Sequence, residues 1–155
     1  YYDSAGETVY VSLLVANAGT YEYKIFLGDL AGSDGIGFNH DDTLYAYAGD
    51  GGNKGTIGSW TRSNTNLLVM GVEVVSHDGG EDRTANVSFW LNPTSLGGSA
   101  PAATFTTNNT SINLDADEMY LSDDPGAIID EIRIGTTYAD VTPELSPKGT
   151  VITIK

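Results

Sequence analysis

Apolar and polar residues alternate along much of this chain, and a period of two is typical of β-strands that are buried on one face. Between Thr8 and Ala16, the apolar face consists of Val9, Val11, Leu13 and Val15. Between Thr84 and Asn92, the apolar face consists of Ala85, Val87, Phe89 and Leu91. Trp90 falls on the opposite side of this second segment, with two polar residues. Both segments are predicted to be strands.

The whole pattern predicts about ten short strands separated by turn-forming residues. Further expected strands cover residues 21–27, 36–39, 43–48, 66–76, 117–122, 127–135 and 150–155. The strands 8–16 and 21–27 are expected to pair as a β-hairpin across the turn NAGT. Pro93–Thr110 is expected to be a polar excursion, and no segment predicts an amphipathic helix. Many short strands at this spacing are typical of an all-β sandwich or jelly roll.

The charge of the chain excludes several classes of partner. It has 21 acidic and 7 basic residues and a net charge of -14, which repels nucleic acids and anionic membrane surfaces. It also lacks the run of about 18 apolar residues that membrane insertion requires. With no cysteine, disulfides and thiolate metal sites are excluded.

The chain begins at Tyr1 as a mature or excised fragment would. Residues 1–155 are expected to form one domain, in which 144–155 is either an extra strand or the start of a following segment.

Ile129–Pro143 resembles the closing segment of bacterial laminin-G-like, concanavalin A-like lectin-glucanase jelly rolls. Weaker likenesses are Val9–Val15 and the stretch Leu67–Pro93 with its final Leu-Asn-Pro. Together they span most of residues 8–143. The resemblance implies a concanavalin A-like jelly-roll sandwich of two antiparallel sheets, in a secreted or surface-exposed module. The chain departs from the family in its short segment before Val9 and in the tail Thr150–Lys155, which lies beyond the resemblance.

Asp130 and Glu131 stand in the middle of the apolar run 127–135, where an unpaired charge is costly to bury. Strict alternation places Glu131 on one face with Ile129 and Arg133, and it is expected to pair with Arg133. The same alternation places Asp130 on the other face, with Ile128, Ile132 and Ile134.

For Asp130 two interpretations remain open. It either caps turn N–H groups at the edge of the sandwich, or binds a cation that links the two ends of the domain. The resemblance implies a structural Ca²⁺ near this point. Asp123 and Asp124 of the preceding loop SDDPG offer further carboxylates for it.

No enzyme activity is expected. The chain has no cysteine nucleophile and no G-x-S-x-G turn. Glycoside hydrolysis requires two carboxylates that flank one bond, whereas the adjacent Asp130 and Glu131 diverge from a strand.

Sugar binding remains, because glycan sites combine aromatic faces with a few placed polar groups. The candidate ligand-binding residues are Tyr45, Tyr47, Trp60 and Trp90. The alternative is that these rings fill the core or cover a sheet, as most aromatic residues do.

The leading hypothesis is therefore a non-catalytic, extracellular or cell-surface module that binds a polysaccharide and carries a structural Ca²⁺. The alternative hypothesis is a structural or adhesive surface or filament domain that binds other protein chains. In that case the strand Thr150–Lys155 self-associates by donation between subunits.

Overall fold

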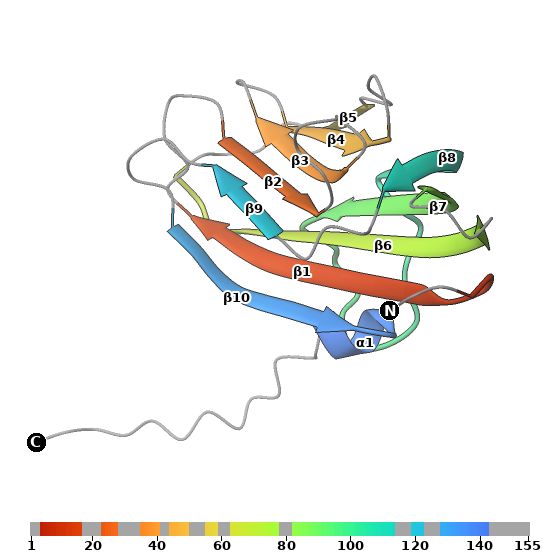
Figure 1. The fold of residues 1–155 in the computed structure, drawn as a ribbon. Helices are drawn as coiled ribbons and strands as arrows, with labels where there is room; N and C mark the ends of the chain where they lie inside the picture. Colours follow the sequence, from red (N-terminus) through yellow and green to blue (C-terminus); the bar gives the residue numbers. More distant parts are fainter. Residues whose placement is uncertain are drawn as a thin grey trace, which may run out of the picture.

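The described residues of the computed structural model form two antiparallel five-stranded sheets (Figure 1). It describes residues 4–16, 23–27, 35–40, 44–49, 55–58, 63–77, 82–113, 119–122 and 128–142. Sheet A has the order β10 (Ile128–Gly135), β1 (Thr8–Ala16), β6 (Asn66–His77), β7 (Asp82–Leu91) and β8 (Phe105–Asn113). Sheet B has the order β5 (Gly55–Gly58), β4 (Leu44–Ala48), β3 (Ile36–His40), β2 (Tyr23–Leu27) and β9 (Met119–Ser122). The prediction of an all-β protein with two antiparallel sheets is confirmed.

One apolar layer lies between the sheets. Alternate residues of β1, β4, β6 and β7 face it, and the expected inward sides of β1 and β7 are confirmed by their burial. Phe38 of sheet B meets Phe89 of sheet A edge to face, with ring centroids 5.4 Å apart, and both side chains are fully buried. Burial of each such ring contributes about 1.5–3 kcal/mol to folding, so this layer supplies much of the stability.

The expected hairpin between the first two strands is wrong. β1 pairs with β10 and β6 in sheet A, whereas β2 pairs with β3 and β9 in sheet B. The reason lies in β1, whose outer positions Tyr10 and Leu14 are partly buried in addition to its inner valines. A strand with apolar side chains on both faces suits a central place in a sheet that is covered on both sides: the core between the sheets covers the inner face of β1, and Trp90 and Tyr138 pack on its outer face.

The expectation that Pro93–Thr110 is a polar excursion is wrong for its last part, which belongs to β8. β8 is an edge strand of sheet A and carries few apolar side chains, of which Ile112 is fully buried. Its register shifts opposite β7, since Ala85 pairs with Thr110 and Val87 with Thr107. This bulge and the polar composition hide the period of two.

The Leu-Asn-Pro motif ends β7. Asn92 has a φ of 48°, a left-handed conformation that asparagine tolerates better than most residues. Its side-chain oxygen accepts a hydrogen bond from the Leu67 N–H at 2.8 Å, and its amide donates to Asn66 Oδ1 at 2.9 Å. Asn92 therefore ties the chain reversal after β7 to the start of β6.

A single helical turn, α1 (Tyr138–Val141), follows β10, although no helix was expected. It begins with a capping box: the Asp140 N–H donates to Thr137 Oγ1, and the Thr137 N–H donates to Asp140 Oδ2 at 2.9 Å. Tyr138 and Val141 face the sheet and are buried. Four residues are too few to show helical periodicity, so the capping residues were the available signal. No helix among the residues described is long and apolar enough to cross a membrane.

The capping box predicts a pH dependence of stability. Hydrogen bonding from the Thr137 side chain, and then from its backbone, lowers the pKa of Asp140 below its usual value. The carboxylate therefore stabilises the folded state above the unfolded-state pKa, and this contribution is lost as the pH falls through the lowered folded-state pKa. We expect Asp140→Asn to lower the free energy of unfolding at neutral pH, and the difference from the wild type to shrink in acid.

Urea denaturation at a series of pH values measures this effect. In a Thr137→Ala background, Asp140→Asn is expected to have a smaller effect, because the Thr137 side chain is already absent and only its backbone N–H remains as a donor. An Asp140→Asn effect that is the same at neutral and acidic pH contradicts the prediction.

Candidate functional site

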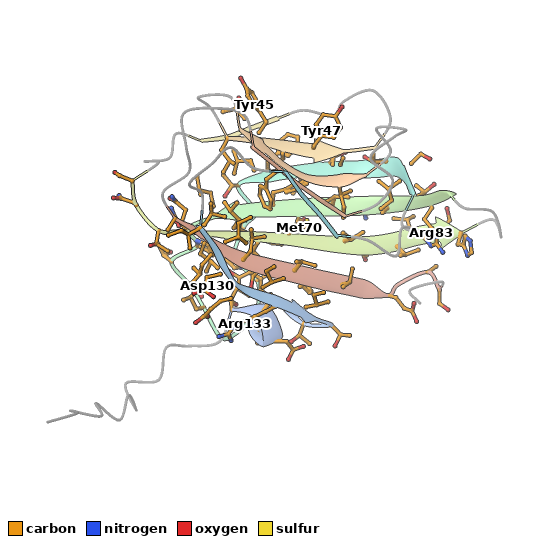
Figure 2. The ribbon with its side chains drawn as sticks, turned by 60° about the vertical axis from the view of Figure 1, so that its left-hand side comes forward. Tyr45, Tyr47, Met70, Arg83, Asp130 and Arg133 are labelled. Carbon is orange, nitrogen blue, oxygen red and sulfur yellow. The ribbon has the colours of Figure 1, made fainter. Side chains whose placement is uncertain are left out.

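The aromatic residues predicted to bind a ligand do not lie on one surface. Tyr45 and Tyr47 project from β4 on the face of sheet B that is turned away from the core, and both are half-buried (Figure 2). Trp90 lies on the outer face of sheet A, on the other side of the sandwich. Trp60 lies outside the described residues. The structure thus separates two aromatic surfaces that the sequence could not distinguish.

Trp90 is held in place by a second apolar cluster on the outer face of sheet A. Only 5% of Trp90 is exposed. The centroid of its ring lies 5.4 Å from the ring centroid of Tyr138 and 6.2 Å from that of Tyr10. Its indole N–H donates to the Pro101 carbonyl at 3.0 Å. Trp90 can therefore contribute an edge to a binding site, but not a freely exposed face.

A pocket of about 250 Å³ opens beside this cluster, and we call it the aromatic pocket. It is lined by Thr8, Tyr10, Gly71, Glu73, Asn86, Ser88 and Trp90. These residues come from three neighbouring strands whose register places them side by side: Thr8 pairs with Glu73, and Glu73 with Asn86. In the next row the register aligns Tyr10, Gly71 and Ser88. Segments about 80 residues apart in sequence therefore build one site on one sheet face.

Gly71 forms the floor of the aromatic pocket. A Cβ atom at this position would lie 2.7 Å from Tyr10 Cε1 and 3.3 Å from Trp90 Cζ3. The missing side chain lets the Tyr10 ring lie against the sheet, and it leaves backbone at the base of the pocket. A larger residue would push the ring away.

The aromatic pocket combines rings with hydrogen-bonding groups. Asn86 Nδ2 donates to Glu73 Oε2 at 3.0 Å, which orients both side chains. Thr8 and Ser88 add hydroxyl groups to the lining. Of these residues only Trp90 was among the predicted ligand-binding set. Tyr10, Gly71 and Glu73 were missed, because their common location depends on the pairing of β1 with β6.

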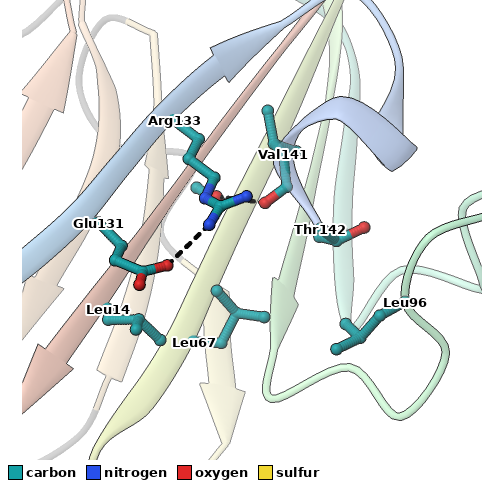
Figure 3. Close-up of a pocket in the computed structure, with 8 residues that line it drawn as sticks. Leu14, Leu67, Leu96, Glu131, Arg133, Val141 and Thr142 are labelled. Atoms are coloured by element: carbon teal, nitrogen blue, oxygen red, sulfur yellow. Dashed lines mark hydrogen bonds and ion pairs between the residues drawn. The ribbon is translucent and has the colours of Figure 1, made fainter. Parts of the chain in front are cut away.

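A second pocket, the leucine pocket, has a different character (Figure 3). It measures about 130 Å³ and is lined by Ser12, Leu14, Leu67, Leu96, Glu131, Arg133, Val141 and Thr142. At its base Ser12 Oγ donates to the Val141 carbonyl at 2.6 Å. Three of the eight described residues that line it are leucines and none carries an aromatic ring, so its lining is unlike a sugar site.

The strand that carries Asp130 departs from strict alternation. Ser12 pairs with Arg133 but Leu14 pairs with Asp130, so β10 has one extra residue between these pairs, a β-bulge. Glu131, in this bulge, has a φ of 49°. Because Ser12 and Leu14 share the outer face of β1, Asp130 and Arg133 share that face too. The prediction that they lie on opposite faces is wrong.

The apolar run around Asp130 does not bury it. Asp130 is exposed, and so are the three isoleucines that alternation placed on its face: Ile128, Ile132 and Ile134. Asp130 Oδ1 accepts a hydrogen bond from the Glu131 N–H at 2.7 Å. The predicted ion pair between Glu131 and Arg133 is confirmed at 2.9 Å, but both side chains are about half exposed to solvent, so it contributes little to stability.

The calcium prediction involves three carboxylates, of which the structure describes one. Asp130 lies on the edge strand of sheet A, and its carboxylate keeps capacity for further ligands beside the Glu131 N–H (Figure 2). Asp123 and Asp124 lie outside the described residues. Within the described part of the chain, no three acidic, histidine or cysteine side chains gather as a metal site requires. The exposed Asp130 fits a peripheral Ca²⁺ ligand, and the site stays a prediction.

Comparisons with family models, with characterised proteins and with solved structures found no match to this chain. The likeness to laminin-G-like jelly rolls therefore depends on the motifs quoted above, and the fold established here is a two-sheet antiparallel sandwich.

Calcium binding through Asp130 predicts a concentration-dependent rise in the melting temperature. At a Ca²⁺ concentration 100 times the Kd, the folded state gains about 2.7 kcal/mol, because only the folded chain assembles the ligands. We expect this gain to be strongly reduced in Asp130→Asn and retained in Asp140→Asn, which removes a carboxylate from the capping box instead. Differential scanning calorimetry with Ca²⁺ and with Mg²⁺ measures it. An unchanged melting temperature at about 10 mM Ca²⁺, above the Kd range of extracellular modules, contradicts the prediction.

Proposed function

We propose that this protein is a non-catalytic carbohydrate-binding module of the concanavalin A-like jelly-roll type, and that it acts outside the cell or at the cell surface. The observation that carries this proposal is the aromatic pocket, in which Tyr10 and Trp90 lie beside Glu73, Asn86 and the pocket hydroxyls. Sugars have apolar ring faces and polar edges, and this lining offers a partner for each.

The size and position of the pocket fit a polymer better than an isolated small molecule. Its volume of about 250 Å³ lies just below the range of about 300–1,000 Å³ typical of drug-sized ligands, so it holds roughly one sugar unit. It opens on a sheet face, so neighbouring units of a chain can extend beyond it. A polysaccharide is therefore the proposed ligand.

The same lining supports a binding rather than a catalytic role. Glu73 is the one carboxylate among the described residues that line the aromatic pocket. Glycoside hydrolysis by the common mechanisms uses two carboxylates on either side of the bond. Asn86 instead holds the Glu73 carboxylate in a hydrogen bond suited to a fixed binding group.

Two pairs of variants locate the binding surface. Tyr10→Ala removes a ring of the aromatic pocket, whereas Tyr45→Ala removes a ring from the outer face of sheet B. We expect Tyr10→Ala to weaken polysaccharide binding about tenfold or more, and Tyr45→Ala to leave it unchanged. Because Tyr10 also packs on Trp90, Asn86→Ala provides a second test with less effect on packing; Asn39→Ala, at the register position beside Tyr45, is its control.

Affinity electrophoresis in plant and marine polysaccharides measures these effects after a glycan array has identified a ligand. Loss of binding in Tyr45→Ala with full binding in Tyr10→Ala would show that the binding site lies on sheet B instead. An array without any bound glycan would overturn the proposed function.

A second function, as an adhesive or structural domain, is favoured by one observation. β10 is the edge strand of sheet A, and it exposes Ile128 by 56%, Ile132 by 44% and Ile134 by 62%. An exposed apolar edge offers backbone groups to a further strand. The sequence Thr150–Lys155, which lies outside the described residues, has the β-branched composition of such a strand.

Strand donation between subunits predicts assembly that depends on protein concentration. We expect Ile134→Lys, and deletion of residues 150–155, to shift the assembled protein to monomer in size-exclusion chromatography with light scattering. Val75→Lys is the matched control, since Val75 is an exposed apolar residue of β6 away from this edge. A wild-type protein that stays monomeric at high concentration would exclude this function.

A further inference from the structure

The charge of the aromatic pocket limits which class of sugar the pocket can bind. This inference rests on the proposed function. Among the described residues of its lining, Glu73 alone is charged, and no lysine or arginine lines the pocket. Glu73 is exposed on β6, so its carboxylate meets a ligand in water-accessible space. The pocket therefore presents a negative charge with no cation from the lining to balance it.

The geometry keeps this carboxylate at the pocket and available to a ligand. Glu73 stands between Thr8 and Asn86 in one cross-strand row, and Asn86 Nδ2 donates to its Oε2 at 3.0 Å. An ionised carboxylate has about four acceptor sites, so this bond leaves several of them for a ligand. The adjacent row brings the Tyr10 ring over Gly71, so Tyr10 and Glu73 line the same pocket from neighbouring rows.

An acidic side chain next to an aromatic face is suited to a cationic group. A ligand ammonium gains from the carboxylate as a charge-assisted hydrogen bond and from the ring as a cation–π contact. The apolar face of a sugar ring can then pack against the Tyr10 ring. The net charge of -14 adds a long-range attraction for cationic polymers and repels polymers that carry carboxylates or sulfates.

We infer that the aromatic pocket selects amino sugars with a free amino group, such as the glucosamine units of a deacetylated polysaccharide, and that Glu73 is the residue that determines this selectivity. Asn86 positions the carboxylate, and Tyr10 supplies the apolar surface. Acidic sugars are excluded, because their carboxylates would lie next to Glu73 without a compensating cation. Neutral sugars keep the ring contact and lose the ion pair.

Three oligosaccharides of equal length separate these contributions: a β-1,4-linked glucosamine oligomer, the same oligomer with every amine acetylated, and an oligogalacturonate. Isothermal titration calorimetry at mildly acidic pH keeps the amines protonated. We expect the free amine to bind about fivefold more tightly than its acetylated form, the range of an exposed ion pair, and the oligogalacturonate not to bind. The preference is expected to fall with added salt.

The deciding variant is Glu73→Gln, which keeps the shape of the side chain and an oxygen that can accept from Asn86, but removes the negative charge. It is expected to abolish the preference for the free amine, measured as the ratio of the dissociation constants of the free-amine and acetylated oligomers for this variant. Glu131→Gln makes the same change in net charge at the leucine pocket, and it is expected to keep the preference. A lysine oligomer of equal charge, which lacks sugar rings, is expected to bind more weakly than the glucosamine oligomer.

The outcomes distinguish the two proposals. Equal binding of the amine and acetylated oligomers, or a preference that survives Glu73→Gln, overturns the selectivity for amino sugars while sugar binding stands. A preference lost equally in Glu131→Gln shows attraction by net charge alone, and it also overturns the role of Glu73. Failure of all three oligosaccharides, together with an array without a bound glycan, overturns the proposed function itself.

Discussion

The rest of the structure depends on the apolar layer between the two sheets, where the ring centroids of Phe38 and Phe89 lie 5.4 Å apart. Both side chains are fully buried, and the surrounding core draws residues from strands that span the chain from β1 to β8. Since successive side chains of a strand point to opposite faces, burial of one set dictates that the other set faces outward. The core thereby determines which residues can meet a ligand. Trp90 is on an outer face because its neighbour Phe89 is committed to the core.

The outer face of sheet A shows how one surface is divided between stability and recognition. At one end, Trp90 and Tyr138 are buried together in the second cluster, and α1 closes over the strands. At the other end the register brings small and polar side chains around Gly71, and the sheet stays open. Tyr10 lies at the boundary and takes part in both, as its ring contacts with Trp90 and Tyr138 show. A pocket wall that is anchored in this way is already ordered before a ligand binds, which lowers the entropic cost of binding.

The edge strand β10 has features that favour pairing with a further strand and features that limit such pairing. Exposed isoleucines would invite pairing with any extended chain, and natural sheets limit such pairing with charges and bulges. β10 has both, because its bulge falls at Glu131 and the pair Glu131–Arg133 lies on the outer face. Asp130 satisfies the backbone N–H of Glu131, so the carboxylates in this apolar run serve the geometry of an exposed edge. A strand that pairs here has to match the bulge, which makes the edge selective rather than generally adhesive.

The sequence by itself determined the strands with clear alternation, including which sides of β1 and β7 face the core, and it placed Trp90 opposite that core. Alternation is a local property, so it can be read without knowing the neighbouring strands. Only the tertiary structure decided which strands pair, and therefore that β1 leaves β2 for the other sheet and that Tyr10, Glu73 and Asn86 share a pocket. It also decided the bulge in β10, since an extra residue is visible only against the register of a partner strand. Pairing depends on the total apolar surface that all strands bury together, and no local pattern contains that sum.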